Sequence, residues 1–200
     1  MKVFLSLILL FFCSACIQLG GEPQEQHYYL LTPQAQTQMD NQPVRDLFIR
    51  QVDFPVYLDR PQIVTRSMQN ELEIATTERW GEPLQDNLLR VLKENLQRRL
   101  GQFDISNYPW QPASENGLLL KLTVNQFDGI LGHQTNVDIR WTLSDSDSQQ
   151  ILARQHFVAK LPIGNSFSDL VSGLSRAVEQ LSADIGRELK AASLKSAAHT

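Results

Sequence analysis

The chain has 200 residues, of which 42% are hydrophobic and 20% are charged, and its 18 basic and 22 acidic side chains give a net charge of −4. A chain of this length is typical of one globular domain that buries enough surface to fold without disulfide bonds. The charge balance and the lack of any run of Lys and Arg argue against a nucleic-acid-binding protein.

The N-terminus has the pattern of an export signal. Lys2 supplies a positive charge, and the segment from Val3 to Phe12 is apolar except for Ser6. Such a run is too short for a transmembrane helix, which needs about 20 residues, but it fits the apolar core of a signal peptide. No comparable run follows it, so we expect an exported protein that does not span the membrane.

Both cysteines follow this apolar core. Cleavage after Ala15 would place small residues before the cut and leave Cys16 as the first residue of the mature protein. The stretch from Cys13 to Cys16 resembles the bacterial lipoprotein box, although Cys13 occupies the position where Leu is usual. We therefore predict a signal peptide over residues 1–15 and lipid attachment at Cys16, which would carry a diacylglycerol thioether and an N-acyl chain. Secretion with a free thiol is the alternative.

The residues after Cys16 predict where the anchor holds the protein. Ile17 stands where Asp usually signals retention in the inner membrane, so lipoprotein sorting rules imply the outer membrane of a Gram-negative cell, facing the periplasm. Residues 16–27, with Gly20 and Gly21, are predicted to form the lipidated Cys and a flexible tether. Two or more acyl chains would give stable anchoring.

Beyond the tether, residues 28–195 are predicted to form one domain and residues 196–200 a frayed tail. Short β-prone runs predict strands at 28–32, 47–51, 62–66 and 71–74. Apolar residues at helical spacing predict a helix over 84–100, begun by Pro83 and ended by Gly101. Three alternating runs, at 118–124, 137–143 and 151–161, predict an antiparallel meander, and a last helix is expected over 170–189.

This order predicts an α+β fold, a two-layer sandwich in which two long amphipathic helices pack on one face of a mainly antiparallel sheet. Ser166 and Asp169 have the spacing of a capping box at the start of the last helix. The same capping role argues against Ser166 as a hydrolase nucleophile.

Other patterns for catalysis, metal or nucleotide binding are incomplete. Asp145 and Asp147 resemble the start of a calcium loop, but Gln150 and His156 stand where that loop needs Gly and Glu. The four His residues form no metal-binding spacing, and no phosphate-binding Gly-rich loop occurs. We therefore expect no enzyme, no metal and no cofactor apart from the covalent lipid.

Two stretches place Arg and Pro beside apolar or aromatic side chains at element boundaries. One contains Arg60, Pro61 and Arg66, and the other contains Arg79 and Trp80. Turn formation with a half-buried Trp would explain both. Because Trp and Arg are enriched in binding hot spots, contact with a protein partner is the alternative interpretation.

Taken together, four motifs resemble the PqiC/YmbA family of ABC-type transport auxiliary lipoprotein components. They are the lipoprotein box, Tyr-Tyr-Leu-Leu at 28–31, Asp-Arg-Pro-Gln-Ile-Val-Thr-Arg at 59–66, and Arg-Trp-Gly-Glu-Pro-Leu at 79–84. The last two together are fairly specific, and the resemblance runs over nearly the whole mature domain.

The resemblance implies a function that the residues alone do not. Family members are outer-membrane lipoproteins that accompany an MCE-domain protein spanning the periplasm, with an inner-membrane permease. The chain would then dock or cap this lipid-transport system and support envelope integrity, and the resemblance also implies a homo-oligomeric ring. Two alternatives remain open: a lipoprotein regulator of a periplasmic enzyme, such as a peptidoglycan synthase, and a structural envelope lipoprotein.

Overall fold

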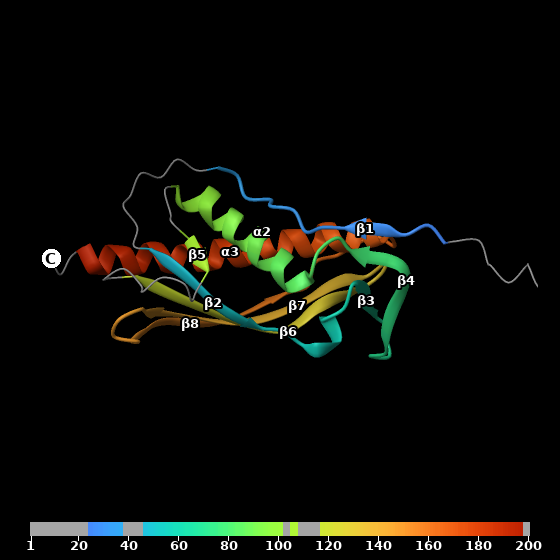
Figure 1. Ribbon diagram of the computed structural model, residues 1–200, viewed down its shortest axis with the longest axis horizontal. Coiled ribbons are helices and arrows are strands. Elements are labelled where there is room, and N and C mark those ends of the chain that lie inside the picture. The colour runs from blue at the N-terminus through green and yellow to red at the C-terminus, as the bar shows by residue number, and fades with distance from the viewer. Residues whose placement is uncertain (1–23, 38–45, 102–104, 108–116, 198–200) are drawn as a thin grey trace, which may run out of the picture.

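The computed structural model describes residues 24–37, 46–101, 105–107 and 117–197. Two helices, α2 (Leu84–Leu100) and α3 (Phe167–Ala197), lie side by side over one face of a five-stranded sheet (Figure 1). The predicted α+β class, with both long helices on one face, is confirmed. The predicted signal peptide, Cys16 and most of the tether lie outside the described residues.

The large sheet is built on the predicted meander. It comprises β6 (Leu118–Ile130), β7 (Gln134–Asp145) and β8 (Ile151–Ala159), paired antiparallel, and its full strand order is β5-β2-β6-β7-β8. Alternate side chains such as Leu120, Leu122 and Trp141 point toward the helices and are buried. The strands therefore have one apolar face and one polar face.

The sheets are mixed rather than mainly antiparallel, which corrects the sequence expectation. Strand β2 (Leu47–Asp53) runs parallel to β6 and to β5 (Ile105–Asn107), a strand that the sequence did not predict. Parallel neighbours need a crossover connection, and α2 lies on the path of the chain from β2 to β6. Periodicity detects a strand but not its partner, so the parallel pairing could not be read from it.

A second sheet has three strands in the order β1-β4-β3. The hairpin of β3 (Gln62–Arg66) and β4 (Leu72–Trp80) was predicted, but β4 extends well beyond the expected end at Ile74. Strand β1 (His27–Tyr29) runs parallel to the end of β4 and begins at His27, a residue predicted to belong to the tether. A short 3₁₀ helix, η2 (Val56–Leu58), precedes β3 and was not predicted.

Both helices begin as their sequences indicate, and α2 also ends where expected. Helix α2 starts directly after Pro83 and ends at Gly101, whose positive φ of 72° is accessible to Gly. In α3, the Ser166 hydroxyl accepts a hydrogen bond from the Asp169 N–H at 3.0 Å, and Asp169 accepts one from the Ser166 N–H at 3.2 Å, which confirms the capping box. Helix α3 reaches Ala197, two residues into the predicted tail.

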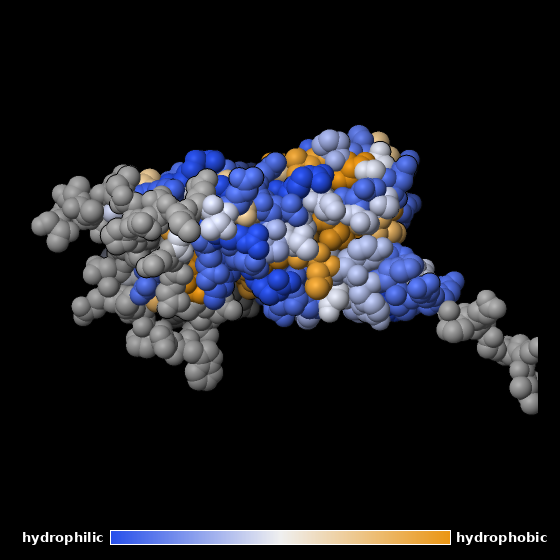
Figure 2. All heavy atoms as spheres, turned by 90° about the horizontal axis from the view of Figure 1, so that it is seen from above, coloured by the Kyte–Doolittle hydropathy of each residue, from blue (hydrophilic) through white to orange (hydrophobic). Residues whose placement is uncertain are grey.

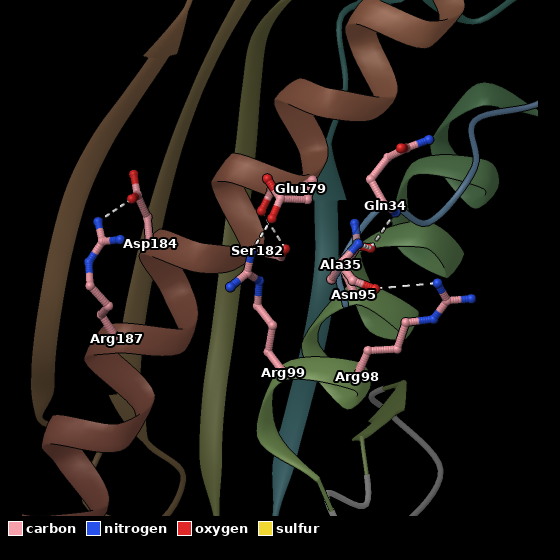
Figure 3. A network of polar contacts seen from close by, with 9 residues as sticks. All are labelled: Gln34, Ala35, Asn95, Arg98, Arg99, Glu179, Ser182, Asp184 and Arg187. Carbon is pink, nitrogen blue, oxygen red and sulfur yellow. Dashed lines mark hydrogen bonds and ion pairs between the residues drawn. The ribbon is translucent and has the colours of Figure 1, made fainter. Parts of the chain in front are cut away.

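The chain from β1 is fixed across the helix layer by buried side chains. Asn95 of α2 accepts hydrogen bonds from the backbone N–H groups of Gln34 and Ala35, both at 3.0 Å (Figure 3). Asn87, about two turns nearer the start of the same helix, accepts one from the Leu31 N–H at 2.7 Å. These bonds explain why the predicted strand at 28–32 stops at Tyr29: the backbone beyond it bonds to helix side chains instead of a strand.

The described surface carries apolar patches without a membrane-spanning element. Seen from the helix side, it is mainly hydrophilic, and apolar patches gather toward the end where β1 and β4 lie (Figure 2). Exposed apolar side chains at that end include Tyr28 and Leu30. Among the residues that the structure describes, no helix is long and apolar enough to cross a membrane.

Candidate partner-binding site

The two sequence stretches singled out as candidate contacts meet in space. The Trp80 N–H donates a 2.7 Å hydrogen bond to the Pro61 carbonyl, and Gln62 pairs with Arg79 across the β3–β4 hairpin. Arg60, Pro61 and Trp80 line a surface cleft of about 500 Å³, formed between the segment after β2 and the start of α2. Trp80 is buried and forms part of its floor, whereas Pro61 is exposed.

Arg60 has unused hydrogen-bonding capacity in this cleft. Its guanidinium makes no hydrogen bond or ion pair with the described residues, and its Nε is buried without a partner there. Buried donors normally have partners, so an unmet one at a cleft favours a ligand or protein that supplies an acceptor. The cleft thus combines an aromatic floor with an available cation.

The acidic side chains around Arg60 differ in availability. Glu82 accepts hydrogen bonds from Asn87 at 2.6 Å and from Arg90 at 2.7 Å, so its charge is already compensated. Asp59 and Asp86 also line the cleft and are exposed. A partner surface that meets this cleft would therefore need both acceptors for Arg60 and donors for the two aspartates.

Arg66 lies outside this cleft and forms a bond within the fold. Its guanidinium contacts the carboxylate of Asp128 on β6 at 3.1 Å, and the Tyr57 hydroxyl donates to the same carboxylate oxygen at 2.9 Å. Asp128 is buried, and Gln126 and Asn136 donate to its other oxygen. This bond ties the small sheet to the large one, and contact of Arg66 with a partner stays a prediction.

This network also shifts proton affinities. Burial and the charge of Asp128 raise the pKa of Tyr57 to about 12. Burial alone would lower the pKa of Arg66, but the hydrogen bond and charge of Asp128 raise it. Arg66 also lies over the Tyr57 ring at 5.9 Å from its centroid. The Tyr57 hydroxyl therefore stays neutral and the Arg66 guanidinium stays charged.

Arg79 is not part of the cleft. It donates to the Gln26 side chain on the N-terminal segment, next to a polar group in which Glu78 accepts from His27 at 2.9 Å. Hydrogen bonds from Tyr29 and His27 lower the pKa of Glu78, and the bond to Glu78 raises the pKa of His27. Arg79 thus helps fix β1 and the entry of the N-terminal segment.

The remaining sequence candidates have local structural roles. The Asp145 carboxylate accepts bonds from the N–H groups of Asp147 and Ser148, at 3.2 and 3.0 Å, which makes a hairpin turn. Ser166 is occupied by the α3 cap. Within the described ranges, no group of three His, Cys, Asp or Glu side chains could hold a metal ion.

Sequence reasoning missed two polar residues that fix the N-terminal segment to α2. Asn87 and Asn95 are both fully buried on the apolar stripe of α2, where they sit among Leu and Val. A polar residue on an apolar stripe is the signal that would have identified them, because a buried amide needs partners. The partners themselves, on residues 31–35, could not be inferred.

Comparison with known proteins identifies this arrangement. The fold is shared with the crystal structure of an uncharacterised protein (24% identity, TM-score 0.69, 83% of this chain and 99% of that one). A Xanthomonas campestris protein is similar at 17% identity and TM-score 0.69, over 86% of this chain and 99% of its own. At these identities the likeness shows the fold: helices on one face of a mixed sheet.

Comparison of the sequence identifies the protein family. Residues 28–186 match the family model of the ABC-type transport auxiliary lipoprotein component, and the chain belongs to this family. The intermembrane transport lipoproteins PqiC of Escherichia coli and Shigella flexneri are each 26% identical over 191 residues, which is 95% of this chain and 98% of theirs. The resemblance found in the sequence motifs is thereby confirmed.

Proposed function

We propose that this chain is an outer-membrane lipoprotein that docks or caps a periplasm-spanning MCE-type lipid transport system. Cys16 would anchor it, with the domain facing the periplasm and acting without catalysis. The observation that carries the proposal is the similarity to the intermembrane transport lipoprotein PqiC along 95% of the chain. In this role it would support intermembrane lipid transport and envelope integrity.

The interior of the domain favours docking over carrying lipid between the layers. The side chains between the helices and the large sheet form one packed cluster, in which Leu88, Leu120 and Leu181 are fully buried. An acyl chain would have to displace this core. The cleft at Arg60, Pro61 and Trp80 is open at the surface instead, and its aromatic and cationic character suits a protein contact.

The partner would be the MCE-domain protein, working with the inner-membrane permease of the same system, and the docked form could be a homo-oligomeric ring. A photo-crosslinking amino acid at Pro61 in the acylated protein tests this contact in cells. We expect an adduct with an MCE-domain protein. The same amino acid at Arg187, on the exposed side of α3, is the control and should give none. An adduct with a peptidoglycan synthase, or no specific adduct, would contradict the proposal.

The anchor is tested separately by metabolic labelling with an alkyne-bearing fatty acid. Wild-type protein should incorporate the label and fractionate with the outer membrane. The Cys16→Ser variant should lose the label. The matched control, Cys13→Ser, should keep it because Cys13 would be removed with the signal peptide. Label that survives Cys16→Ser would disprove attachment at this residue.

A further inference from the structure

The face of the large sheet turned away from the helices carries a cluster of cationic side chains. In the strand register, Lys121 of β6, Thr142 of β7 and Arg154 of β8 lie opposite one another in one row. Arg140 lies in the next row, between Thr123 and His156. Facing side chains have Cβ atoms about 5 Å apart and diagonal neighbours about 7–8 Å. Lys121 and Arg154 are therefore the cross-strand neighbours of Thr142, and Arg140 lies two residues before it on the same face.

These residues line an open cleft of about 700 Å³. Arg140 and Arg154 are exposed, and neither guanidinium makes a hydrogen bond or ion pair with the described residues. The carboxylates nearby are engaged at the rim: Asp53 lies 3.5 Å from Lys121, and Asp138 contacts His156 at 2.9 Å. Two guanidinium groups with free donors thus face one cleft in a chain whose net charge is −4.

The adjoining row of the same face is less polar. Leu119 and Ile151 pair with Ser144 on either side, both line the cleft, and Ile151 is 50% exposed. The cleft therefore has a cationic part and an apolar part side by side. A simple anion would use only the first, whereas an amphiphile with a charged head would use both.

We propose that this cleft binds the phosphate headgroup of a phospholipid. Arg140 and Arg154 would bind the phosphate oxygens, because the planar guanidinium matches them in charge and geometry, and the Thr142 hydroxyl would add a donor. The start of the acyl chains would rest on the exposed Ile151, beside the largely buried Leu119. This inference deepens the lipid-transport function proposed above and rests on it, since it names the ligand and a surface that holds it.

Native mass spectrometry of the acylated full-length protein in a neutral detergent would test this proposal. The probes are dioctanoyl phosphatidylglycerol, dioctanoylglycerol, which lacks the phosphate, and glycerol 3-phosphate, which lacks the chains. We expect phosphatidylglycerol to bind at least ~10-fold more tightly than either fragment, and the binding to weaken as salt rises. The double variant Arg140→Gln/Arg154→Gln should weaken it by ~10-fold or more.

The control variant is Arg187→Gln, which also removes one exposed guanidinium, from α3. It should bind phosphatidylglycerol as the wild type does. Circular dichroism would verify that the double variant is folded, as expected for exposed side chains. The proposal is overturned by equal binding in the double variant, by glycerol 3-phosphate binding as tightly as the lipid, or by no lipid binding at all. None of these outcomes concerns the MCE contact at Pro61, so the two proposals can fail independently.

Discussion

Arg60 lies two residues before the short strand β3 and Arg66 is the last residue of that strand, yet the two side chains have different surroundings. Arg66 closes a buried network with Asp128 and Tyr57, and its side chain is 22% exposed. Arg60 lines an open cleft, and its guanidinium has no partner among the described residues. The two residues show that the role of an Arg cannot be read from its sequence neighbours, because its hydrogen-bonding partner comes from a distant part of the chain.

The decisive residue is Asp128, which lies 62 residues from Arg66 in the sequence. It is buried and receives donors from four side chains, so its negative charge is compensated inside the protein. No such carboxylate reaches the Arg60 guanidinium in the described structure. The contrast between a closed network and an open cleft can be tested by its effects on stability, in order of size.

The largest effect is expected from Asp128→Ala. It leaves Arg66 without its counter-ion and the Tyr57 hydroxyl without its acceptor, so the free energy of unfolding should fall by about 3 kcal/mol. Urea unfolding followed by circular dichroism measures this loss. Asp53→Ala is the matched control: its ion pair with Lys121 is exposed and should contribute less than about 1 kcal/mol. Equal losses in the two variants would contradict the closed network.

A smaller effect is expected from pH. The pKa of Tyr57 is raised to about 12 in the folded state, whereas an unfolded Tyr titrates near 10. The stabilisation from the neutral hydroxyl is therefore complete below about pH 10 and is lost as the pH rises toward 12. Thermal unfolding between pH 9 and 12 should show a falling midpoint.

Substitution assigns this titration to its residue. Tyr57→Phe should flatten part of the fall above pH 10, because the variant has no hydroxyl to ionise. Tyr29, whose pKa is also raised to about 12 through its hydrogen bond to Glu78, provides the matched variant Tyr29→Phe. If Tyr57→Phe leaves the pH dependence unchanged, the hydroxyl is not held by Asp128.

Much of the fold could be predicted from local pattern. The helix over 84–100 matches α2, the capping box marks the start of α3, and the strands at 118–124 and 137–143 have the predicted parity. Each rests on spacing within one segment, where periodicity and capping chemistry are set by neighbouring residues. The β3–β4 hairpin was predictable for the same reason. In the third strand of the meander, a register shift pairs Ile151 with Ser144 on the face away from the helices, against the predicted parity.

What failed depends on contacts between distant segments. The parallel pairing of β2 with β6 and the short strand β5 follow from a crossover that no local pattern reports. In the candidate site, the proximity of Pro61 to Trp80 follows from the register of the hairpin, which shifts between Gln62 and Val64. The sequence marked both residues but could not join them, and it could not separate Arg66 from Arg60.

The smallest effect on stability is expected from Arg60→Ala, and this is the most informative comparison with Arg66. Because the Arg60 guanidinium has no partner among the described residues, its removal should change the free energy of unfolding by less than about 0.5 kcal/mol. The same variant should reduce capture of the MCE-domain partner by the acylated protein, since interface Arg residues are frequent hot spots. Arg90→Ala, which removes an exposed guanidinium paired with Glu82 at the edge of the same site, separates loss of charge from loss of the specific contact. A large fall in the free energy of unfolding with Arg60→Ala would mean that Arg60, like Arg66, stabilises the fold. The cleft would then have no unpaired cation available to a partner protein.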